Sequence, residues 1–186
     1  KDRRLTYLRQ MDPKTLAAYN YLCDNRQRFP TAVGPVCLEV NLKTVPDNRS
    51  MQQWARIVET CIPRNIATSF IFTDEREQTE FMRACDGRPG EMHANCVFLK
   101  RSALDDATRL LQQHQQQARL PTALQRWGFQ GTVLDLIEAP VEILAALIDT
   151  NHIDQIPFHC SGGSNDGQRI DHDALQSDRD FLNANV

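Results

Sequence analysis

The chain has 186 residues, with 21 lysines and arginines, 24 aspartates and glutamates, and 41% hydrophobic residues. Such a chain suits one medium-sized domain or two small ones and buries about 70% of its unfolded surface. All apolar runs are shorter than the roughly 20 residues that a membrane helix needs, so we expect no membrane span. The first residues lead into no apolar segment, so we expect no secretory signal. A net charge of −3 argues against a uniformly basic nucleic-acid binder.

The charge is unevenly distributed along the chain. Residues 1–29 carry seven basic and three acidic side chains, a net charge of +4, whereas residues 141–186 carry two basic and eight acidic ones, a net charge of −6. A polyanion is therefore expected to prefer the N-terminal end.

The first 29 residues predict two helices. Residues 1–11 are helix-prone, with leucines on one side, and we interpret them as the end of a longer incoming helix. Asp12 and Pro13 form a strong helix start, because an aspartate accepts hydrogen bonds from free amides and proline tolerates the first helical position. Apolar residues three or four apart continue this second helix toward Arg28.

Residues 30–63 predict a strand followed by a helix. Apolar and polar residues alternate over 36–42, which is the pattern of a strand. Ser50 and Gln53 fit a capping box that opens a helix, and Pro63 stops it. The side chains expected to face inward from this helix are Met51, Trp54, Ile57, Val58 and Cys61.

The next segment repeats the order of strand and helix. Residues 68–73 predict a second strand, a helix with an acidic start follows from Asp74, and residues 96–99 predict a short third strand. The side chains that this helix is expected to bury are Phe81, Met82 and Cys85. Because strands alternate with helices from residue 30 to residue 100, this half of the chain is typical of an α/β fold.

The segment 103–120 interrupts that order. It contains a low-complexity run of glutamines around His114, and its apolar stripe is thin. We interpret it as a solvated helix or a linker rather than as a recognition element.

A second, mainly helical half follows. One helix is expected to end at Gly128, because glycine is a common helix stop, and another to start at Pro140 and bury one apolar face. Residues 153–158 predict a strand. Residues 161–186 are polar, acidic and weakly patterned, with many aspartates that favour loops and caps.

The cysteines are dispersed along the chain. They are Cys23, Cys37, Cys61, Cys85, Cys96 and Cys160. No two are separated by two to four residues, so the paired spacing of a structural zinc site is missing, and the chain is too long for a small disulfide scaffold. We interpret them as buried free thiols in a reducing compartment, the cytosol or the nucleus.

The sequence offers no positive case for an enzyme, so no catalytic residue, metal site or cofactor is expected. His159 and Cys160 are adjacent, but neighbours on an extended chain point to opposite faces, which is poor geometry for an activated thiol. The remaining histidines lack metal-ligand spacing, and phosphate-binding loops and nucleophile elbows are missing. A small α/β enzyme with a Cys/His nucleophile stays open as an alternative.

The order of the elements resembles the hinge domain of SMC (structural maintenance of chromosomes) proteins. Within that family the chain looks most like the fifth-type subunit, the partner of the sixth type in the SMC five/six complex. The segments that support the resemblance are 2–5 (DRRL) with the helix to Phe29, 34–41 (GPVCLEVN), 54–63 (WARIVETCIP), 70–72 (FIF), 124–129 (LQRWGF), 139–148 and 153–157. The resemblance covers about residues 1–160.

The resemblance implies an α/β (α+β) hinge of two pseudo-repeated subdomains with an N-terminal coiled-coil stub. The expected parts are the incoming coiled-coil end and junction helix (1–29), subdomain I (30–102), a linker (103–120), and subdomain II with the acidic tail (121–186). The ATPase heads of the full-length family are not in this chain, so the resemblance implies no enzymatic activity.

The resemblance also implies partners. It implies a heterodimer with the sixth-type SMC hinge, non-SMC subunits bound through the arms, and a place in the nucleus on the chromosome, in DNA repair, recombination and chromosome segregation. Gly128, Phe129 and Gly131 are the candidate partner interface, because glycines permit close backbone approach and Phe129 supplies apolar contact. The alternative, that these glycines only cap and turn the chain, stays open.

SMC hinges further resemble one another in binding DNA through basic surface near the coil junction. The candidate residues here are Arg3, Arg4, Arg9, Lys14, Arg26, Arg28, Lys100 and Arg101. Such contacts go to phosphates, so binding is salt-dependent and nearly sequence-blind. Single-stranded DNA is the candidate ligand, and the double-stranded form stays open; Trp54 and Trp127 lie on apolar helix faces, which favours core packing over base stacking. A protein-only structural adaptor, with these cations solvated or ion-paired, is the other alternative.

Overall fold

The computed structural model describes residues 2–43, 50–88, 90–116, 120, 122–126 and 128–159. In chain order its helices are α1 (Asp2–Met11), α2 (Pro13–Asp24), α3 (Val36–Glu39), α4 (Met51–Cys61), α5 (Arg64–Ala67), α6 (Glu75–Asp86), α7 (Arg101–Gln116), α8 (Thr122–Arg126), α9 (Val133–Leu136) and α10 (Val141–Asn151). Its strands are β1 (Asn41–Leu42), β2 (Ser69–Phe72), β3 (Asn95–Phe98), β4 (Gly131–Thr132), β5 (Ile137–Glu138) and β6 (Pro157–Phe158).

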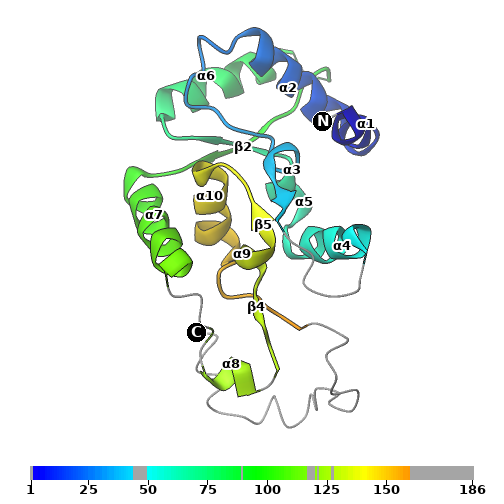
Figure 1. Ribbon diagram of the computed structural model, residues 1–186. Coiled ribbons are helices and arrows are strands. Elements are labelled where there is room, and N and C mark those ends of the chain that lie inside the picture. Colours follow the sequence, from blue (N-terminus) through cyan, green and yellow to red (C-terminus); the bar gives the residue numbers. More distant parts are fainter. Residues whose placement is uncertain are drawn as a thin grey trace.

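These elements form two lobes, one above the other in Figure 1. The upper lobe holds α1, α2 and α6 above β2, and the lower lobe holds α4, α7, α9 and α10, with β4 and α8 at its lower end (Figure 1). The strands form three pairs: β2 with β3 in parallel, β1 with β5 antiparallel, and β4 with β6 antiparallel. Among the described residues, none of the helices combines the length and apolarity that a bilayer crossing demands.

The chain repeats one order of elements. In the first half Val33 bridges Ile71 of β2 antiparallel, and α3, β1, α4 and the one-turn helix α5 lie between them in the chain; α5 has no counterpart among the described residues of the second half. In the second half β4 pairs antiparallel with β6, and α9, β5 and α10 lie between them. The two halves meet where β1 pairs with β5, with Asn41 opposite Glu138 and Leu42 opposite Ile137. The expected α/β fold with two pseudo-repeated parts is confirmed.

Local capping chemistry confirms three predicted helix starts. The side chain of Asp12 accepts a hydrogen bond from the Thr15 amide at 3.0 Å and opens α2. Ser50 and Gln53 form the predicted capping box of α4. Asp74 accepts from two amides in the first turn of α6, which connects the parallel strands β2 and β3. The second helix is shorter than predicted, because α2 ends at Asp24 instead of continuing toward Arg28.

Two methionines predicted to be buried are exposed. Met51 is 56% exposed, because it is the first residue of α4 and lies one turn beyond Trp54, where the core ends. Met82 is 41% exposed, because the buried face of α6 is defined by Phe81 and Cys85, four residues apart, and Met82 lies about 100° around the helix from Phe81.

The predicted strand over 36–42 is wrong for most of its length. Residues 36–39 form the one-turn helix α3, and only Asn41 and Leu42 are in a strand. Val36 and Leu38 are both buried, but Val36 packs into the core with Trp54, whereas Leu38 packs beneath α1 with Leu8. Alternating burial therefore reflects two separate cores rather than one face of a sheet.

The interpretation of 103–120 as a solvated helix or linker is wrong for its apolar face. The helix α7 packs along α10, as Figure 1 shows, and Ala107 is buried in the largest core. Leu104, Leu110 and Leu111 pack against the same core. The thin apolar stripe of α7 is sufficient to pack this helix onto the core, because α10 is apolar on several sides.

The predicted strand over 153–158 is shorter in the structure. Only Pro157 and Phe158 are in β6, whereas Ile153 is fully buried in the turn after α10. The predictions for Trp127, Cys160 and residues 161–186 lie outside the described residues.

The largest core joins both halves of the chain. It combines Trp54 and Ile71 from the first half with Ile143 and Leu147 from the second. A second core surrounds Phe81 between α2, α6 and β2, and a small third core lies beneath α1. The domain boundaries listed above stay predictions.

Candidate functional site

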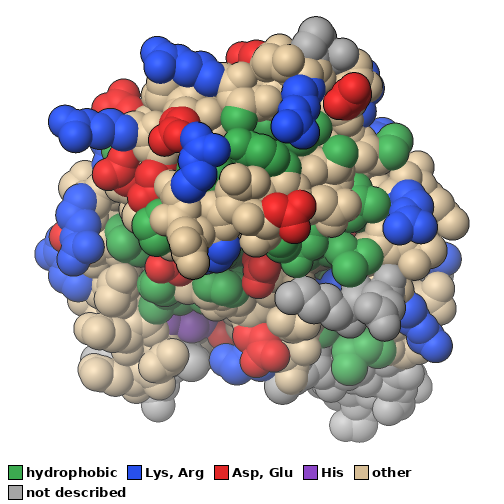
Figure 2. All heavy atoms as spheres, turned by 90° about the horizontal axis from the view of Figure 1, so that it is seen from above, with side chains coloured by type: hydrophobic (Ala, Val, Ile, Leu, Met, Phe, Trp, Pro, Cys, Tyr) green, Lys and Arg blue, Asp and Glu red, His purple; other side chains and the backbone are tan. Residues whose placement is uncertain are grey.

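The basic residues predicted to bind DNA do not gather in one patch. Figure 2 shows the face of the upper lobe seen from above, where lysine and arginine side chains alternate with aspartate and glutamate side chains. Arg3, Arg4 and Arg9 lie on α1 and Lys14 lies in the first turn of α2, whereas Lys100 and Arg101 lie at the start of α7 in the lower lobe. The predicted set is therefore divided among several surfaces.

Arg4 holds the first helix onto the body of the molecule. Its guanidinium donates from Nη1 to the Leu38 carbonyl at 3.0 Å and from Nη2 to Asn41 Oδ1 at 2.6 Å. These bonds connect α1 to α3 and β1. Arg4 therefore has a structural role in addition to its charge.

Three further cations of the predicted set have partners within the chain. Arg28 forms an ion pair with Glu80, which raises the pKa of the Arg28 guanidinium, and it lies over the Phe29 ring. Arg101 forms an ion pair with Asp105 at 3.2 Å. Arg26 donates a hydrogen bond to the Ala32 carbonyl. The two ion pairs reduce the positive potential that a phosphate would meet at Arg28 and Arg101.

The other four cations of the predicted set are open to solvent. Arg3, Arg9, Lys14 and Lys100 are exposed and form no ion pair or side-chain hydrogen bond with any residue that the structure describes. Arg3 and Arg9 lie on α1, so the open cations are concentrated at the N-terminal end of the upper lobe.

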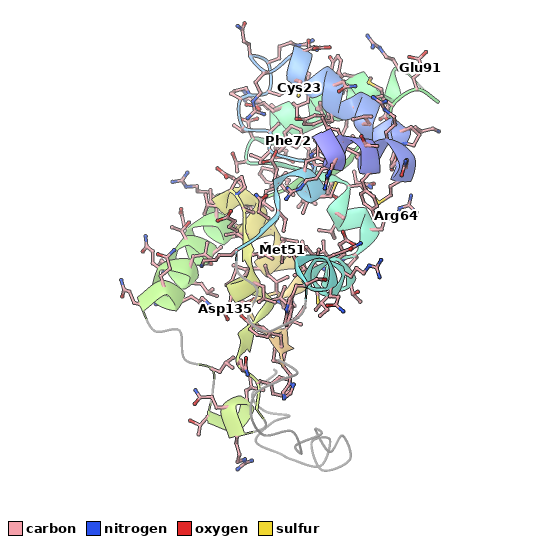
Figure 3. All side chains as sticks on the ribbon, turned by 45° about the vertical axis from the view of Figure 1, so that its right-hand side comes forward. Cys23, Met51, Arg64, Phe72, Glu91 and Asp135 are labelled. Carbon is pink, nitrogen blue, oxygen red and sulfur yellow. The ribbon has the colours of Figure 1, made fainter. Side chains whose placement is uncertain are left out.

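A groove of about 830 Å³ lies between α1, α3, α4 and α5. Arg3, Arg4 and Arg64 are among its lining residues, together with Tyr7 and Met51, which are 53% and 56% exposed. Figure 3 labels Met51 at the start of α4 and Arg64 on α5. The groove thus combines three cations and two carboxylates, Glu59 and Glu138, with exposed apolar and aromatic surface.

Arg64 was missed by the sequence reasoning. Its guanidinium donates from Nη2 to the Met11 carbonyl at 2.6 Å, at the end of α1. In the sequence it is separated by 53 residues from that carbonyl, and no basic cluster surrounds it. Only the packing of α1 on α5 brings it beside Arg3 and Arg4.

The turn 128–131 leads into β4. Gly128 has φ +81°, a conformation that favours glycine, and its amide donates to Gln125 O at 3.0 Å. Phe129 is half-buried. Gly131 is buried, and a Cβ atom there would lie 2.6 Å from Cε1 of Phe158, so β4 and β6 approach more closely than a side chain would permit. The role of this turn in partner binding stays a prediction.

The described cysteines are mostly unreactive. Burial raises the pKa of the Cys37 and Cys85 thiols to about 11 and that of Cys96 to about 12, so these thiols are neutral at physiological pH. Cys23 is exposed, contrary to the expectation of burial. Within the described ranges, no group of three His, Cys, Asp or Glu side chains has the arrangement of a metal site.

The arrangement of two pseudo-repeated halves joined by β1 and β5 is the fold of an SMC hinge. It is similar to the crystal structure of the Smc5/6 hinge domain of S. pombe, with a TM-score of 0.58 and 20% sequence identity over 85% of this chain. The chain spans 53% of the length of that solved chain. No family model matches the sequence. At this level of identity the likeness shows the fold.

Proposed function

We propose that this chain is a hinge of the fifth SMC type and forms a heterodimer with a sixth-type SMC hinge. The observation that supports this most is the likeness of its fold to the Smc5/6 hinge domain of S. pombe. As part of the same proposal, the chain is not an enzyme and works in the nucleus on the chromosome, in DNA repair, recombination and segregation. Non-SMC subunits join the complex through the arms.

An open strand edge supports the pairing. Among the described residues β3 is hydrogen-bonded to β2 on one side only, and Phe98 at its end is 36% exposed. Open edges and exposed aromatic residues are features that a soluble monomer normally avoids and that a partner can cover. The second proposed contact is the turn formed by Gly128, Phe129 and Gly131 in the other lobe, so that each hinge offers one surface from each half.

The groove beside α1 supports DNA binding. Arg3, Arg4 and Arg64 line it with one more charge than the carboxylates of Glu59 and Glu138, and Arg9 adds an exposed cation on α1 outside the groove lining. Phosphates pair with such cations, whereas bases stack on aromatic rings, and Tyr7 offers its ring at the same groove. Because only unpaired bases can stack in this way, we propose single-stranded DNA as the preferred form.

Size-exclusion chromatography with light scattering tests the pairing. The chain mixed with a sixth-type SMC hinge is expected to elute as a 1:1 complex, whereas the control, the chain mixed with an unrelated α/β domain, is expected to elute as separate species. A persistent monomer with an unchanged circular dichroism spectrum would contradict the proposal.

Titration of labelled single-stranded DNA at several salt concentrations tests the DNA contacts. Each phosphate contact contributes roughly 0.7 to the slope of log affinity against log salt, so Arg3→Ala and Arg9→Ala should each lower the slope by up to about that amount. Arg83→Ala on α6, an exposed arginine away from the groove, is the matched control. If all variants keep the affinity and the slope, the protein-only adaptor is the better description.

A further inference from the structure

A polar contact joins the end of α7 to the turn after β4. His114 Nε2 lies 2.6 Å from Asp135 Oδ1. Asp135 Oδ2 accepts a hydrogen bond from the Thr132 amide at 2.7 Å and lies 3.3 Å from the Thr132 hydroxyl. A carboxylate accepts and an imidazole N–H donates, so the network assigns the donor role to His114 Nε2. One carboxylate therefore ties α7 to the capping box that opens α9.

The same carboxylate packs against β4. A Cβ atom at Gly131 would lie 2.7 Å from Asp135 Oδ2 and 2.6 Å from Cε1 of Phe158, so the carboxylate and the ring both pack against this glycine. Gly131 and Thr132 thus contact the Asp135 side chain and also pair with β6. The turn 128–131 ends at this pair of residues, so the Asp135 carboxylate lies at the point where the turn enters β4.

His114 differs from its neighbours in α7. Within 112–116 it is half-buried, whereas the four glutamines around it are exposed. The rest of α7 packs along α10 through apolar side chains, so His114 is the polar extension of α7 toward the lower end of the molecule. Figure 3 labels Asp135, which lies on the side of α9 toward α7.

We propose that His114 is a positioning residue for the partner-binding turn. By donating a hydrogen bond to Asp135, it holds the carboxylate against Gly131 and Thr132 and thereby fixes the turn 128–131 in the conformation that the partner hinge meets. This inference rests on the proposed pairing and adds a residue of α7, outside the turn itself, to the partner surface.

A positioning role differs from a general contribution to stability. The side chains of His114 and Asp135 are 28% and 31% exposed, so water can replace the lost hydrogen bond and the global free energy of unfolding should change little. The order of the turn should change more, because local openings are governed by local contacts. Removing this hydrogen bond should therefore lower both the partner affinity and the order of the turn, while the global free energy of unfolding changes little.

Four variants separate these effects. His114→Ala removes the donor, His114→Gln retains an N–H donor, Asp135→Asn removes the carboxylate, and Gln113→Ala is the control on the exposed face of the same turn. Titration calorimetry measures the affinity for a sixth-type SMC hinge. Hydrogen exchange of the Thr132 amide, measured on the isolated chain, reports the turn, and urea unfolding reports global stability.

His114→Ala is expected to weaken partner binding about tenfold, because the partner must then order the turn, and to speed exchange at Thr132 by a similar factor. His114→Gln should stay within roughly threefold of the wild type, and Gln113→Ala should be unchanged. The double variant with Asp135→Asn should bind no more weakly than Asp135→Asn alone, because both changes break the same contact.

Two results would overturn the inference. The first is a His114→Ala variant with unchanged affinity and unchanged Thr132 exchange. The second is a loss of affinity that the fall in urea stability fully accounts for. If the wild-type chain binds no hinge, the proposed pairing fails instead, and the exchange rate on the isolated chain still decides whether His114 fixes the turn.

Discussion

The two halves of the molecule share an order of elements but differ in the pairing and burial of their last strands. In the first half β2 lies between the Val33 bridge and β3, and Phe70, Ile71 and Phe72 are fully buried. In the second half the equivalent strand β6 pairs with β4 alone among the described residues, and Phe158 is half-buried.

Each half covers the other. Trp54 of α4, in the first half, packs edge-to-face on Phe158 of β6 with ring centroids 5.6 Å apart. In return Ile71 of β2 lies in the same core as Ile143 and Leu147 of α10. The strand β6 of the second half is thus covered by a side chain of the first half. The pair of β4 and β6, which is less buried than β2, lies beside the proposed partner-binding turn.

Trp54→Ala should give the largest effect. The side chain is fully buried, and replacing a buried tryptophan by alanine costs about 3–5 kcal/mol. Because Trp54 covers a strand of the other half, we expect both halves to lose stability together, as one lower urea midpoint seen by circular dichroism and by near-ultraviolet signals. Met51→Ala, in the exposed first turn of the same helix, should change the free energy by less than about 0.5 kcal/mol.

Two separate unfolding transitions in Trp54→Ala would contradict this mutual cover. Double variants with Phe158→Ala sharpen the result, because an edge-to-face ring pair should show a coupling of about 0.5–1.5 kcal/mol. A coupling near zero would mean that each half closes its own core.

Substitution of one glycine in each half compares how tightly the two halves are packed. Gly34 in the first half has φ +121°, and a Cβ atom there would lie 3.0 Å from the Ser69 carbonyl oxygen, a backbone atom that cannot move away. Gly34→Ala should cost about 3 kcal/mol in urea unfolding, from backbone strain and overpacking. In Gly131→Ala the added Cβ atom would contact the side chains of Phe158 and Asp135, which can rotate away. We therefore expect a loss of about 1–2 kcal/mol in the free energy of unfolding.

The order of these two costs is the measurement that matters. If Gly131→Ala destabilises the protein more than Gly34→Ala does, the second half is the more tightly packed one, contrary to the burial of β2 and β6. Gly90→Ala is a useful control, because Gly90 has φ +90° but no atom within 4 Å of an added Cβ, so it isolates the backbone strain.

Sequence reasoning succeeded where the chemistry is local. The helix starts at Asp12, Ser50 and Asp74 follow from hydrogen bonds within one turn. It failed where burial depends on a distant element. The alternation over 36–42 predicts one face of a strand, because a periodic pattern does not specify that two different cores receive the side chains.

The same limit applies to the candidate site. The charge gradient indicated the N-terminal end, and the open cations of α1 do lie there. The sequence could not indicate Arg64, which reaches α1 only through the packing of α5, or the structural role of Arg4, whose partner carbonyl is 34 residues away. His114 lies in a run of glutamines that predicts exposure to solvent, and its partner Asp135 lies 21 residues further along the chain.

The comparison of Arg4→Ala with Arg3→Ala separates the structural role of an arginine on α1 from the effect of its charge. Arg4 donates two hydrogen bonds that hold α1, so its loss should cost about 1–2 kcal/mol in urea unfolding. Arg3 is exposed, and its loss should cost less than about 0.5 kcal/mol. Both remove one charge from the same groove, so both should reduce the salt dependence of DNA binding. If Arg4→Ala leaves stability unchanged, α1 is held by Leu8 with its apolar neighbours and by the hydrogen bond from Arg64 to Met11, and Arg4 belongs with the open cations.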